Sequence, residues 1–258
     1  MNELTLQSYG CTDVGQNRSL NEDYFDMNRS IFVIADGMGG HNGGDIASKM
    51  AVENILRFFN QVDEDQFNKL TDVNKVQNII SEAIFKTNMK VFKESVHHTE
   101  LSGMGTTIVL ALFQKPNIMH IANVGDSRAY HLRKGKLTLL TEDHSVTATM
   151  LRDGTITPPE AKNHPYRHHL TRSIGTSNEV KPYSHLVKVR PNDKILLCSD
   201  GLWNVLSDED IIELFHQYTS PKKICEKLTE KALDLQTMDN ISSIVISISE
   251  KKQMKSNP

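Results

Sequence analysis

Cysteines are scarce in this chain of 258 residues, and none of its three cysteines stands in a metal-binding or redox motif. Cys11, Cys198 and Cys225 are widely separated, and the sequence contains no Cys-x-x-Cys. Disulfide scaffolds and zinc cages need cysteines at short, paired spacings, so neither is expected. The pattern indicates a reduced protein, in which Cys198, inside an apolar run, is an inert core residue.

Excess positive charge and long apolar runs are also lacking. The formal net charge is −3, which provides no general field for attracting nucleic acid or an anionic membrane. The longest apolar runs are far shorter than a bilayer span, and the segment Met1 to Thr5 has neither the basic nor the apolar region of a signal peptide. We therefore expect no nucleic-acid partner, no membrane association and a cytoplasmic location.

Motifs for phosphate loops and for covalent catalysis are missing as well. The glycine-rich stretch 37–44 is not followed by Gly-Lys-Ser/Thr and does not fit Gly-x-Gly-x-x-Gly. No Gly-x-Ser-x-Gly elbow occurs, and Cys198 lacks a Cys-x₅-Arg context. The sequence therefore indicates no nucleophilic side chain.

The organisation of the chain is that of one globular unit. Hydrophobic residues make up 38% and charged residues 24% of the sequence, which is ordinary for a protein with a sizeable core. No linker rich in Pro, Gly or Ser divides it, so residues 1–250 are predicted to form a single domain, followed by a polar tail at 251–258. Residues 145–169 are polar and contain three prolines, which favours a mobile insertion over the surface.

Hydrophobic periodicity changes between blocks of the sequence. Helical spacing predicts helices over 45–59 and 72–94, and a capping box of Ser207 with Asp210 predicts a helix over 208–217. Apolar runs predict strands over 106–113, 118–124 and 127–132. Because helices and strands occur in blocks rather than in strict alternation, the fold class is α+β with mainly antiparallel sheets.

Three separated aspartates are the most informative feature present. Asp36 and Asp200 each follow an apolar run and precede Gly, while Asp239 precedes Asn240 and another predicted strand. Carboxylates at the ends of buried strands are held at the rim of a core, and several together make an oxygen-rich site for Mg²⁺ or Mn²⁺. The alternative is that each Asp only opens a turn, as Asp-Gly and Asp-Asn commonly do.

Further candidates surround these aspartates in the sequence. Arg18 offers a fork suited to a phosphate dianion, and Glu22 and Asp23 could join the carboxylate set directly or through water. Gly37 could bring a backbone carbonyl close to an ion. Asp126, in Gly125-Asp126-Ser127, adds a carboxylate at a strand end or forms a tight turn.

Taken together, these motifs resemble the metal-dependent (PPM) Ser/Thr protein phosphatases, the protein phosphatase 2C-like family, in its compact bacterial form. The matching motifs run through nearly the whole chain and are, in order, Arg18 with Asn21-Glu22-Asp23, Asp36-Gly37-Met38-Gly39-Gly40-His41, Gly103-Met104-Gly105-Thr106-Thr107, Ala122-Asn123-Val124-Gly125-Asp126-Ser127-Arg128-Ala129-Tyr130, Thr141-Glu142-Asp143-His144-Ser145, Leu170-Thr171-Arg172-Ser173-Ile174-Gly175, Ser199-Asp200-Gly201-Leu202-Trp203 and Asp239-Asn240. Each motif alone is weak, and their common order makes the resemblance specific.

The resemblance implies a four-layer α/β/β/α sandwich and two Mn²⁺ or Mg²⁺ ions. By analogy Asp36 bridges both ions, Asp200 and Asp239 bind one, and the Gly37 carbonyl binds the other. The implied outer set is Glu22 and Asp23, which hold metal-bound waters, Arg18, which clamps the substrate phosphate, and Asp126, which helps to hold a third, weaker ion near the flap at 145–169.

The resemblance further implies hydrolysis of phosphoserine and phosphothreonine on proteins by a metal-bridged hydroxide. The expected partners are phosphorylated proteins, including a bacterial Ser/Thr kinase that the enzyme opposes and the substrates of that kinase, and we expect a monomer. Two alternatives stay open: a two-metal phosphatase of small phosphate esters, and a non-catalytic pseudophosphatase that binds phosphoproteins.

One departure concerns the proton donor. Eukaryotic members carry a His directly after the Asp-Gly, whereas here Met38 occupies that position and cannot donate a proton. His41 or a metal-bound water could act instead. His164, His168 and His169 are expected to be solvated surface histidines, and Trp203 is expected to pack behind the site.

Overall fold

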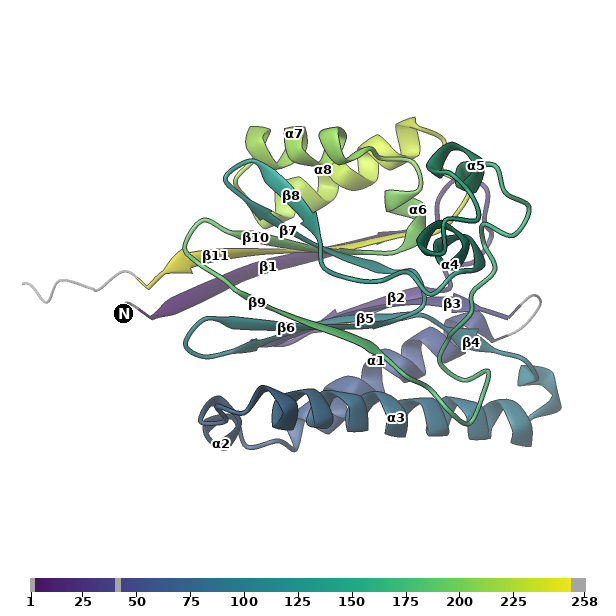
Figure 1. The fold of residues 1–258 in the computed structure, drawn as a ribbon, viewed down its shortest axis with the longest axis horizontal. Helices are drawn as coiled ribbons and strands as arrows, with labels where there is room; N and C mark the ends of the chain where they lie inside the picture. The colour runs from purple at the N-terminus through teal and green to yellow at the C-terminus, as the bar shows by residue number, and fades with distance from the viewer. Residues whose placement is uncertain (1–2, 40–42, 252–258) are drawn as a thin grey trace, which may run out of the picture.

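The computed structural model describes residues 3–39 and 43–251. Two antiparallel sheets lie face to face, and helices cover both outer faces, so that four layers follow one another from top to bottom in Figure 1. This arrangement confirms the predicted α+β sandwich. None of the described helices has the length and apolar character needed to cross a membrane.

The first sheet joins the start of the chain to its end. Its strands lie in the order β1 (Leu4–Asp13), β11 (Ile241–Glu250), β10 (Lys194–Cys198), β7 (Arg128–Arg133) and β8 (Lys136–Leu139), and each neighbouring pair is antiparallel. Helices α7 (Asp208–Gln217) and α8 (Pro221–Asp234) cover its outer face. The strand pairing therefore holds both ends of the described chain in one layer.

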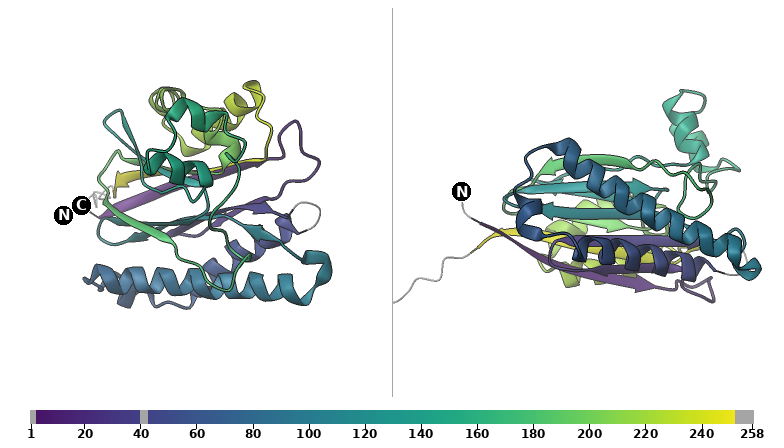
Figure 2. Two further views of the ribbon diagram at one scale, coloured as in Figure 1. Left: turned by 45° about the vertical axis from the view of Figure 1, so that its right-hand side comes forward. Right: turned by 90° about the horizontal axis from the view of Figure 1, so that it is seen from below.

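The second sheet is built from the middle of the sequence. Its strands lie in the order β2 (Asp23–Met27), β3 (Ile31–Met38), β5 (Ile108–Gln114), β6 (Ile118–Val124) and β9 (Tyr183–Lys188), and the short β4 (Gly105–Thr106) pairs with β3. Helices α1 (Gly44–Asn60) and α3 (Val73–His97) cover its outer face, and the short α2 (Glu64–Asn68) and η1 (Thr99–Leu101) flank α3. Figure 2 shows these helices running along the sheet when it is seen from below.

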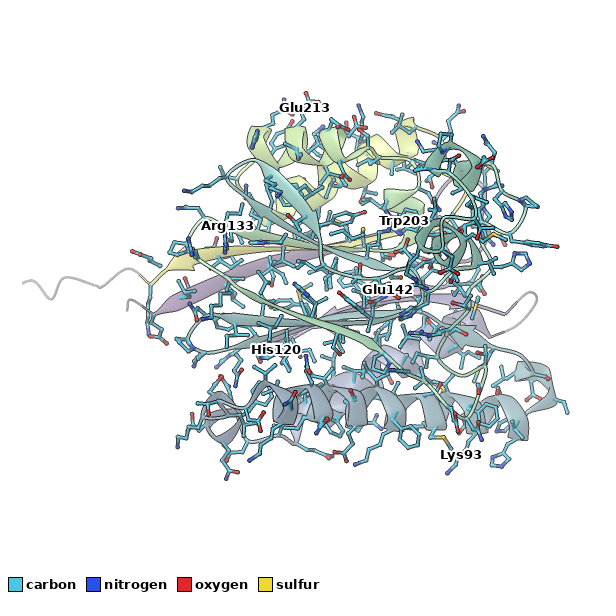
Figure 3. All side chains as sticks on the ribbon, viewed as in Figure 1. Lys93, His120, Arg133, Glu142, Trp203 and Glu213 are labelled. Atoms are coloured by element: carbon cyan, nitrogen blue, oxygen red, sulfur yellow. The ribbon has the colours of Figure 1, made fainter. Side chains whose placement is uncertain are left out.

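Three apolar clusters fill the spaces between the four layers. Strand β3 shows how the alternation works, because Phe32 and Ile34 point into the cluster between the sheets, while Ile31 and Val33 point into the cluster beneath α1 and α3. A third cluster lies between the first sheet and α7 and α8. Successive strand residues point to opposite faces, so a fully apolar strand such as β3 reads as buried on both sides. Figure 3 shows side chains filling the spaces between the layers.

Residues 145–169 contain two short helices that the sequence analysis did not predict, although residues typical of helix N-caps precede both. The predicted surface insertion contains α4 (Val146–Arg152) and α5 (Pro158–Lys162). The Ser145 hydroxyl accepts a hydrogen bond from the Ala148 amide at 3.2 Å, and the Thr157 amide donates to the Glu160 carboxylate at 2.7 Å. Both are helix N-terminal caps. The strand predicted over 106–113 is interrupted at Thr107, between β4 and β5.

Candidate metal centre

Strand register brings the first two carboxylates together. Asp23 opens β2 and lies directly opposite Asp36, near the end of β3. Asp200 begins the short helix α6 (Asp200–Trp203) immediately after β10 and its flanking Ser199. Burial, together with repulsion from Asp23 and Asp200, raises the pKa of Asp36, so carboxylates from both sheets form one cluster. It lies at the edge where α6 and the end of β3 are seen in Figure 1.

Burial makes these carboxylates costly to ionise. Asp23 is 6% exposed and Asp200 is 9% exposed. Burial raises the pKa of Asp23 to about 6. It also raises the pKa of Asp36 and of Asp200 well above the usual range, and repulsion from the neighbouring carboxylates adds to the effect. Acids in such a cluster favour either protonation or a compensating cation.

Two oxygens in the cluster have no protein partner. Oδ1 of Asp23 and Oδ1 of Asp200 are buried and lack a hydrogen bond, and a buried carboxylate oxygen without a partner is costly. These oxygens, in a set made of carboxylates, fit a hard divalent cation. Among residues 3–39 and 43–251, no group of three His, Cys, Asp or Glu side chains is arranged to hold a metal ion. The evidence for a cation site is therefore the negative charge of the neighbouring carboxylates and the two oxygens without a partner.

The other oxygens of the cluster are held by hydroxyl and amide donors. Ser199 Oγ donates to Asp23 Oδ2 at 2.6 Å, and the Ser242 hydroxyl helps to limit the rise in the Asp23 pKa that burial causes. Asn204 Nδ2 donates to Asp200 Oδ2 at 3.1 Å. These donors fix the carboxylate orientations from the side that faces the protein.

Asp239 lies at the rim of the site with Arg18. Arg18 Nη2 donates to Asp239 Oδ2 at 2.8 Å, and the side chains are 46% and 34% exposed, respectively. Burial opposes the charge on Arg18, while its hydrogen bond and attraction to Asp239 raise its pKa. The structure thus places the predicted phosphate clamp beside the carboxylates, at a position that solvent can reach.

Close backbone approach explains the glycines after Asp36. A Cβ at Gly37 would lie 2.1 Å from the Gly44 carbonyl oxygen and 2.6 Å from that of Glu22, so a side chain cannot be accommodated. The Gly37 amide donates to the Glu22 carbonyl at 3.1 Å, and burial raises the pKa of the Glu22 carboxyl. Glycine therefore lets the end of β3, the start of α1 and the Glu22 segment meet next to the cluster.

Asp126 lies in the turn between β6 and β7. It is 7% exposed, and burial, reinforced by repulsion from Asp143, raises its pKa to about 7. Trp203 Nε1 donates to the Asp126 carbonyl at 3.0 Å, and the Arg128 guanidinium carbon lies 3.4 Å from the Trp203 ring centroid. Trp203 is therefore a packing residue behind the site, as expected, and it also ties α6 to the Asp126 turn.

The histidines show a contact that the sequence did not reveal. The side chain of His168 is 56% exposed, in keeping with the prediction, yet its Nδ1 lies 4.0 Å from Asp200 Oδ2. Burial and the nearby Arg167 lower its pKa. His41, the candidate proton donor, lies outside the described residues. Segment 145–169 therefore reaches the carboxylates through His168.

Asn240 is a site residue to which sequence reasoning assigned no role. Its Nδ2 donates to the carbonyls of Val14 and Leu20 at 2.8 and 3.0 Å, and its Oδ1 accepts from the Glu22 amide at 2.9 Å. The sequence shows Asn240 only as part of the Asp239-Asn240 motif. Its hydrogen-bonding partners lie more than two hundred residues away in the sequence, so no local pattern indicates them. Asn240 holds the loop that carries Arg18 against the start of β11.

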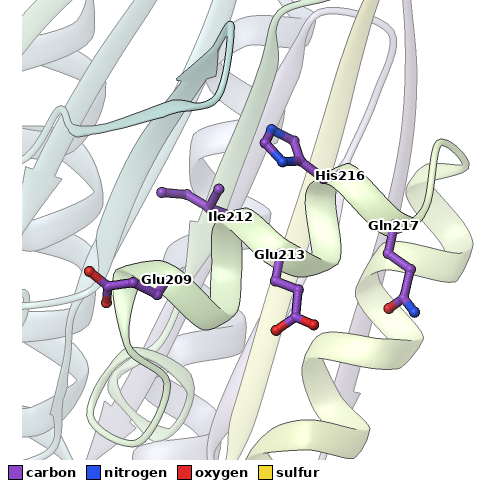
Figure 4. A pocket seen from close by; sticks show the side chains of 5 residues that line it. All are labelled: Glu209, Ile212, Glu213, His216 and Gln217. Atoms are coloured by element: carbon purple, nitrogen blue, oxygen red, sulfur yellow. The ribbon is translucent and has the colours of Figure 1, made fainter.

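A surface hollow of about 550 Å³ lies apart from this cluster. It follows the outer face of α7, is lined by Glu209, Ile212, Glu213, His216 and Gln217, and is drawn in Figure 4. It shares no residue with the carboxylate site.

Known proteins match this chain along most of its length. The family described as protein phosphatase 2C matches residues 14–234. The serine/threonine phosphatase stp of Listeria welshimeri is 33% identical over 240 residues, covering 91% of this chain and 93% of its own. Among solved structures, a bacterial serine phosphatase superposes with a TM-score of 0.87 at 32% identity, covering 96% of this chain and all of its own. The catalytic domain of the serine threonine protein phosphatase PstP, in complex with two manganese ions, superposes with a TM-score of 0.84 at 30% identity, again over 96% of this chain and all of the other.

Proposed function

We propose, because this chain belongs to the protein phosphatase 2C family, that it hydrolyses phosphoserine and phosphothreonine monoesters on proteins. The chain is a metal-dependent phosphatase of the kind represented by its named relatives. The observation that carries the proposal is the convergence of Asp23, Asp36 and Asp200, with orphaned oxygens on two of them, beside the exposed Arg18.

The proposed cofactors are two Mn²⁺ or Mg²⁺ ions, as in the related structure with two manganese ions. Asp36 would contact both ions, Asp200 and Asp239 would hold one, and the Gly37 carbonyl would hold the other. Glu22 and Asp23 would act through water, and Asp23 lies directly opposite Asp36 in the strand pairing. Asp126 would help to hold a third ion. When bound, the ions supply Lewis-acid charge that activates water and neutralises phosphoryl oxygens.

The chain itself contributes binding and orientation. Arg18 would bind the phosphate dianion with its fork, exchanging part of its contact with Asp239 for the substrate. Ser199 and Asn204 hold the carboxylates from behind, so their oxygens stay directed towards the reacting phosphate. Pre-set orientation of this kind contributes to catalysis without reorganisation during the reaction.

Exposure of the rim favours a phosphate carried on a protein. Arg18 and His168 are both about half exposed at the edge of the site, and Tyr166 in segment 145–169 is 51% exposed. A small ester would need no such open rim. We therefore propose that the substrates are phosphorylated proteins, among them a Ser/Thr kinase that the enzyme opposes and the substrates of that kinase.

We further propose that residues 1–250 form one catalytic domain with a flap at 145–169. The enzyme is proposed to act in the cytoplasm as a monomer.

The test is a comparison of phosphopeptides with small phosphate esters in the presence of Mn²⁺. We expect kcat/KM to be higher for phosphothreonine and phosphoserine peptides than for a small alkyl phosphate, and Asp36→Asn to abolish both activities while the fold is retained. Preference for the small ester would support the alternative esterase, and binding of phosphopeptide without turnover at any metal concentration would support a pseudophosphatase.

A further inference from the structure

The packing of β1 against α8 brings together two cysteines from opposite ends of the chain. Lys222 Nζ lies 5.7 Å from the ring centroid of Tyr9, and Cys225 Sγ lies 3.1 Å from the Tyr9 carbonyl oxygen. Cys11 stands two residues after Tyr9 and so faces the same side of the strand. Cys225 stands three residues after Lys222, one turn along the helix. The two elements therefore place Cys11 next to Cys225.

The strand ladder supports the same placement. Cys11 lies opposite Ser243 of β11, and the Ser243 carbonyl oxygen lies 3.9 Å from Cys225 Sγ. Cys11 packs against the apolar cluster that contains Cys225. The interaction between the two neighbouring thiols lowers the pKa of Cys11 and raises that of Cys225, whose burial adds to the increase.

Solvent access differs among the three thiols. Cys11 is partly exposed, whereas Cys225 and Cys198 are fully buried. A small oxidant in solution therefore meets Cys11 first, and the thiolate is the reactive form of cysteine. Cys198 lies inside β10, where burial raises its pKa strongly, and it serves as an internal reference.

We propose that Cys11 and Cys225 form a peroxide-reactive thiol pair that closes a reversible disulfide between β1 and α8. The Cys11 sulfur attacks one oxygen of hydrogen peroxide, the O–O bond breaks, and the first water leaves with a sulfenic acid on Cys11. The Cys225 sulfur then attacks the Cys11 sulfur, the S–O bond breaks, and the second water leaves. The two thiols give up two electrons in total, and one peroxide becomes two waters.

The position of the pair links it to the rim of the catalytic site. The loop after β1 carries Arg18, and the loop after α8 carries Asp239, the two residues that pair at 2.8 Å. A disulfide would fasten the elements from which both loops start. The thiol chemistry itself is independent of the proposed phosphatase substrate.

The experiment treats the folded, full-length protein with hydrogen peroxide, alkylates the remaining thiols after denaturation and identifies the peptides by mass spectrometry. We expect a peptide linked through Cys11 and Cys225 that dithiothreitol releases, forming at least about tenfold faster than any modification of Cys198. Cys198→Ser, the matched control, should form the same link.

Two single variants separate the roles of the thiols. Cys225→Ser should leave Cys11 as a sulfenic acid that dimedone captures, and Cys11→Ser should leave Cys225 unmodified. If Cys225→Ser does not fold, Cys225→Ala gives the same readout. The proposal is wrong if wild-type Cys11 is oxidised to sulfinic acid without a link, if it pairs only between molecules, or if removal of Cys225 leaves the products at Cys11 unchanged.

Discussion

In protein freed of divalent metal by a chelator, Asp126→Asn should remove a large pH-dependent loss of stability. Asp126 is 7% exposed, and its pKa is raised from 3.8 to about 7, mainly by burial and secondarily by Asp143. A folded carboxyl whose pKa exceeds that of the unfolded chain keeps its proton after the unfolded chain has lost it. Stability is therefore full below about pH 4, falls as the pH rises to about 7, and stays reduced above that.

The magnitude follows from the size of the pKa change. A pKa of about 7 against 3.8 corresponds to ~4 kcal/mol, since each pH unit between the two values costs about 1.4 kcal/mol. Asp126→Asn lacks the titrating group. The free energy of unfolding of the variant minus that of wild type should therefore increase by ~3 kcal/mol as the pH is raised from about 5 to about 8.

Two buried histidines also make stability depend on pH. The quantity to measure is therefore the difference in free energy of unfolding between wild type and Asp126→Asn, rather than the curve of wild type alone. Burial lowers the pKa of both His120 and His144 to about 4. A histidine that is held neutral in the folded protein gives the opposite slope, since stability then rises with pH between about 4 and about 6.5. The curve of wild type alone is therefore the sum of opposing slopes from the histidines and the buried carboxylates. Both histidines are present in the variant, so their effect cancels in the difference.

The assay is urea denaturation at several pH values in chelator for wild type, Asp126→Asn and the control Asp26→Asn, which changes an exposed carboxylate on β2. The control should follow wild type at every pH. Added Mn²⁺ should stabilise wild type most at high pH, where Asp126 is ionised. A difference between wild type and Asp126→Asn that stays within about 1 kcal/mol across this range would refute the argument.

Two further predictions concern the rim of the site. Arg18→Ala should raise the KM for a phosphopeptide by roughly tenfold or more with a smaller change in kcat, because a charge-assisted contact to the dianion contributes about 1.5–3 kcal/mol; steady-state kinetics with an unchanged KM would remove Arg18 from phosphate binding. Asn240→Ala should lower the free energy of unfolding by about 1–3 kcal/mol, because the Glu22 amide and two loop carbonyls lose their partner. It should also raise the Mn²⁺ concentration needed for half-maximal activity, and a metal titration matching wild type would show that the loop keeps its position without Asn240.

Features encoded by neighbouring residues could be predicted from the sequence. The strand 118–124 and the helix 208–217 agree with β6 and α7 at both ends, because an apolar run or a capping box lies within the segment itself. The positions of Asp36 and Asp200 at the ends of buried strands followed from the same kind of pattern. Their shared cluster was inferred from the family resemblance, since no local signal states which strands are neighbours.

Features that depend on distant contacts could not be predicted in this way. β1 is partly exposed along its length and lacks a strong apolar alternation, and it forms a strand because β11 supplies its hydrogen-bonding partner. His168 is predicted to lie on the surface because the sequence shows no fourth ligand for a metal site with the neighbouring histidines; its exposure agrees, but this reasoning does not reveal its contact with Asp200. The role of Asn240 depends on carbonyls at Val14 and Leu20, which only the folded chain brings within reach.

The register of β2 against β3 is where fold and site constrain each other. Asp23 lies opposite Asp36, and a shift by one residue would put Tyr24 in its place and turn Asp23 to the other face. Because both faces of β3 are buried, polarity alone does not select this register. Contacts at the end of the strand select it instead: the Gly37 amide donates to the Glu22 carbonyl at 3.1 Å, and Gly37 has no room for a Cβ on that side. On the other side of β3, the Thr107 hydroxyl accepts from the Asp36 amide at 3.0 Å and the Thr106 hydroxyl donates to the Asp36 carbonyl at 2.8 Å. The repulsion among the buried carboxylates is thus tolerated because neutral contacts outside the cluster fix the strand that carries them.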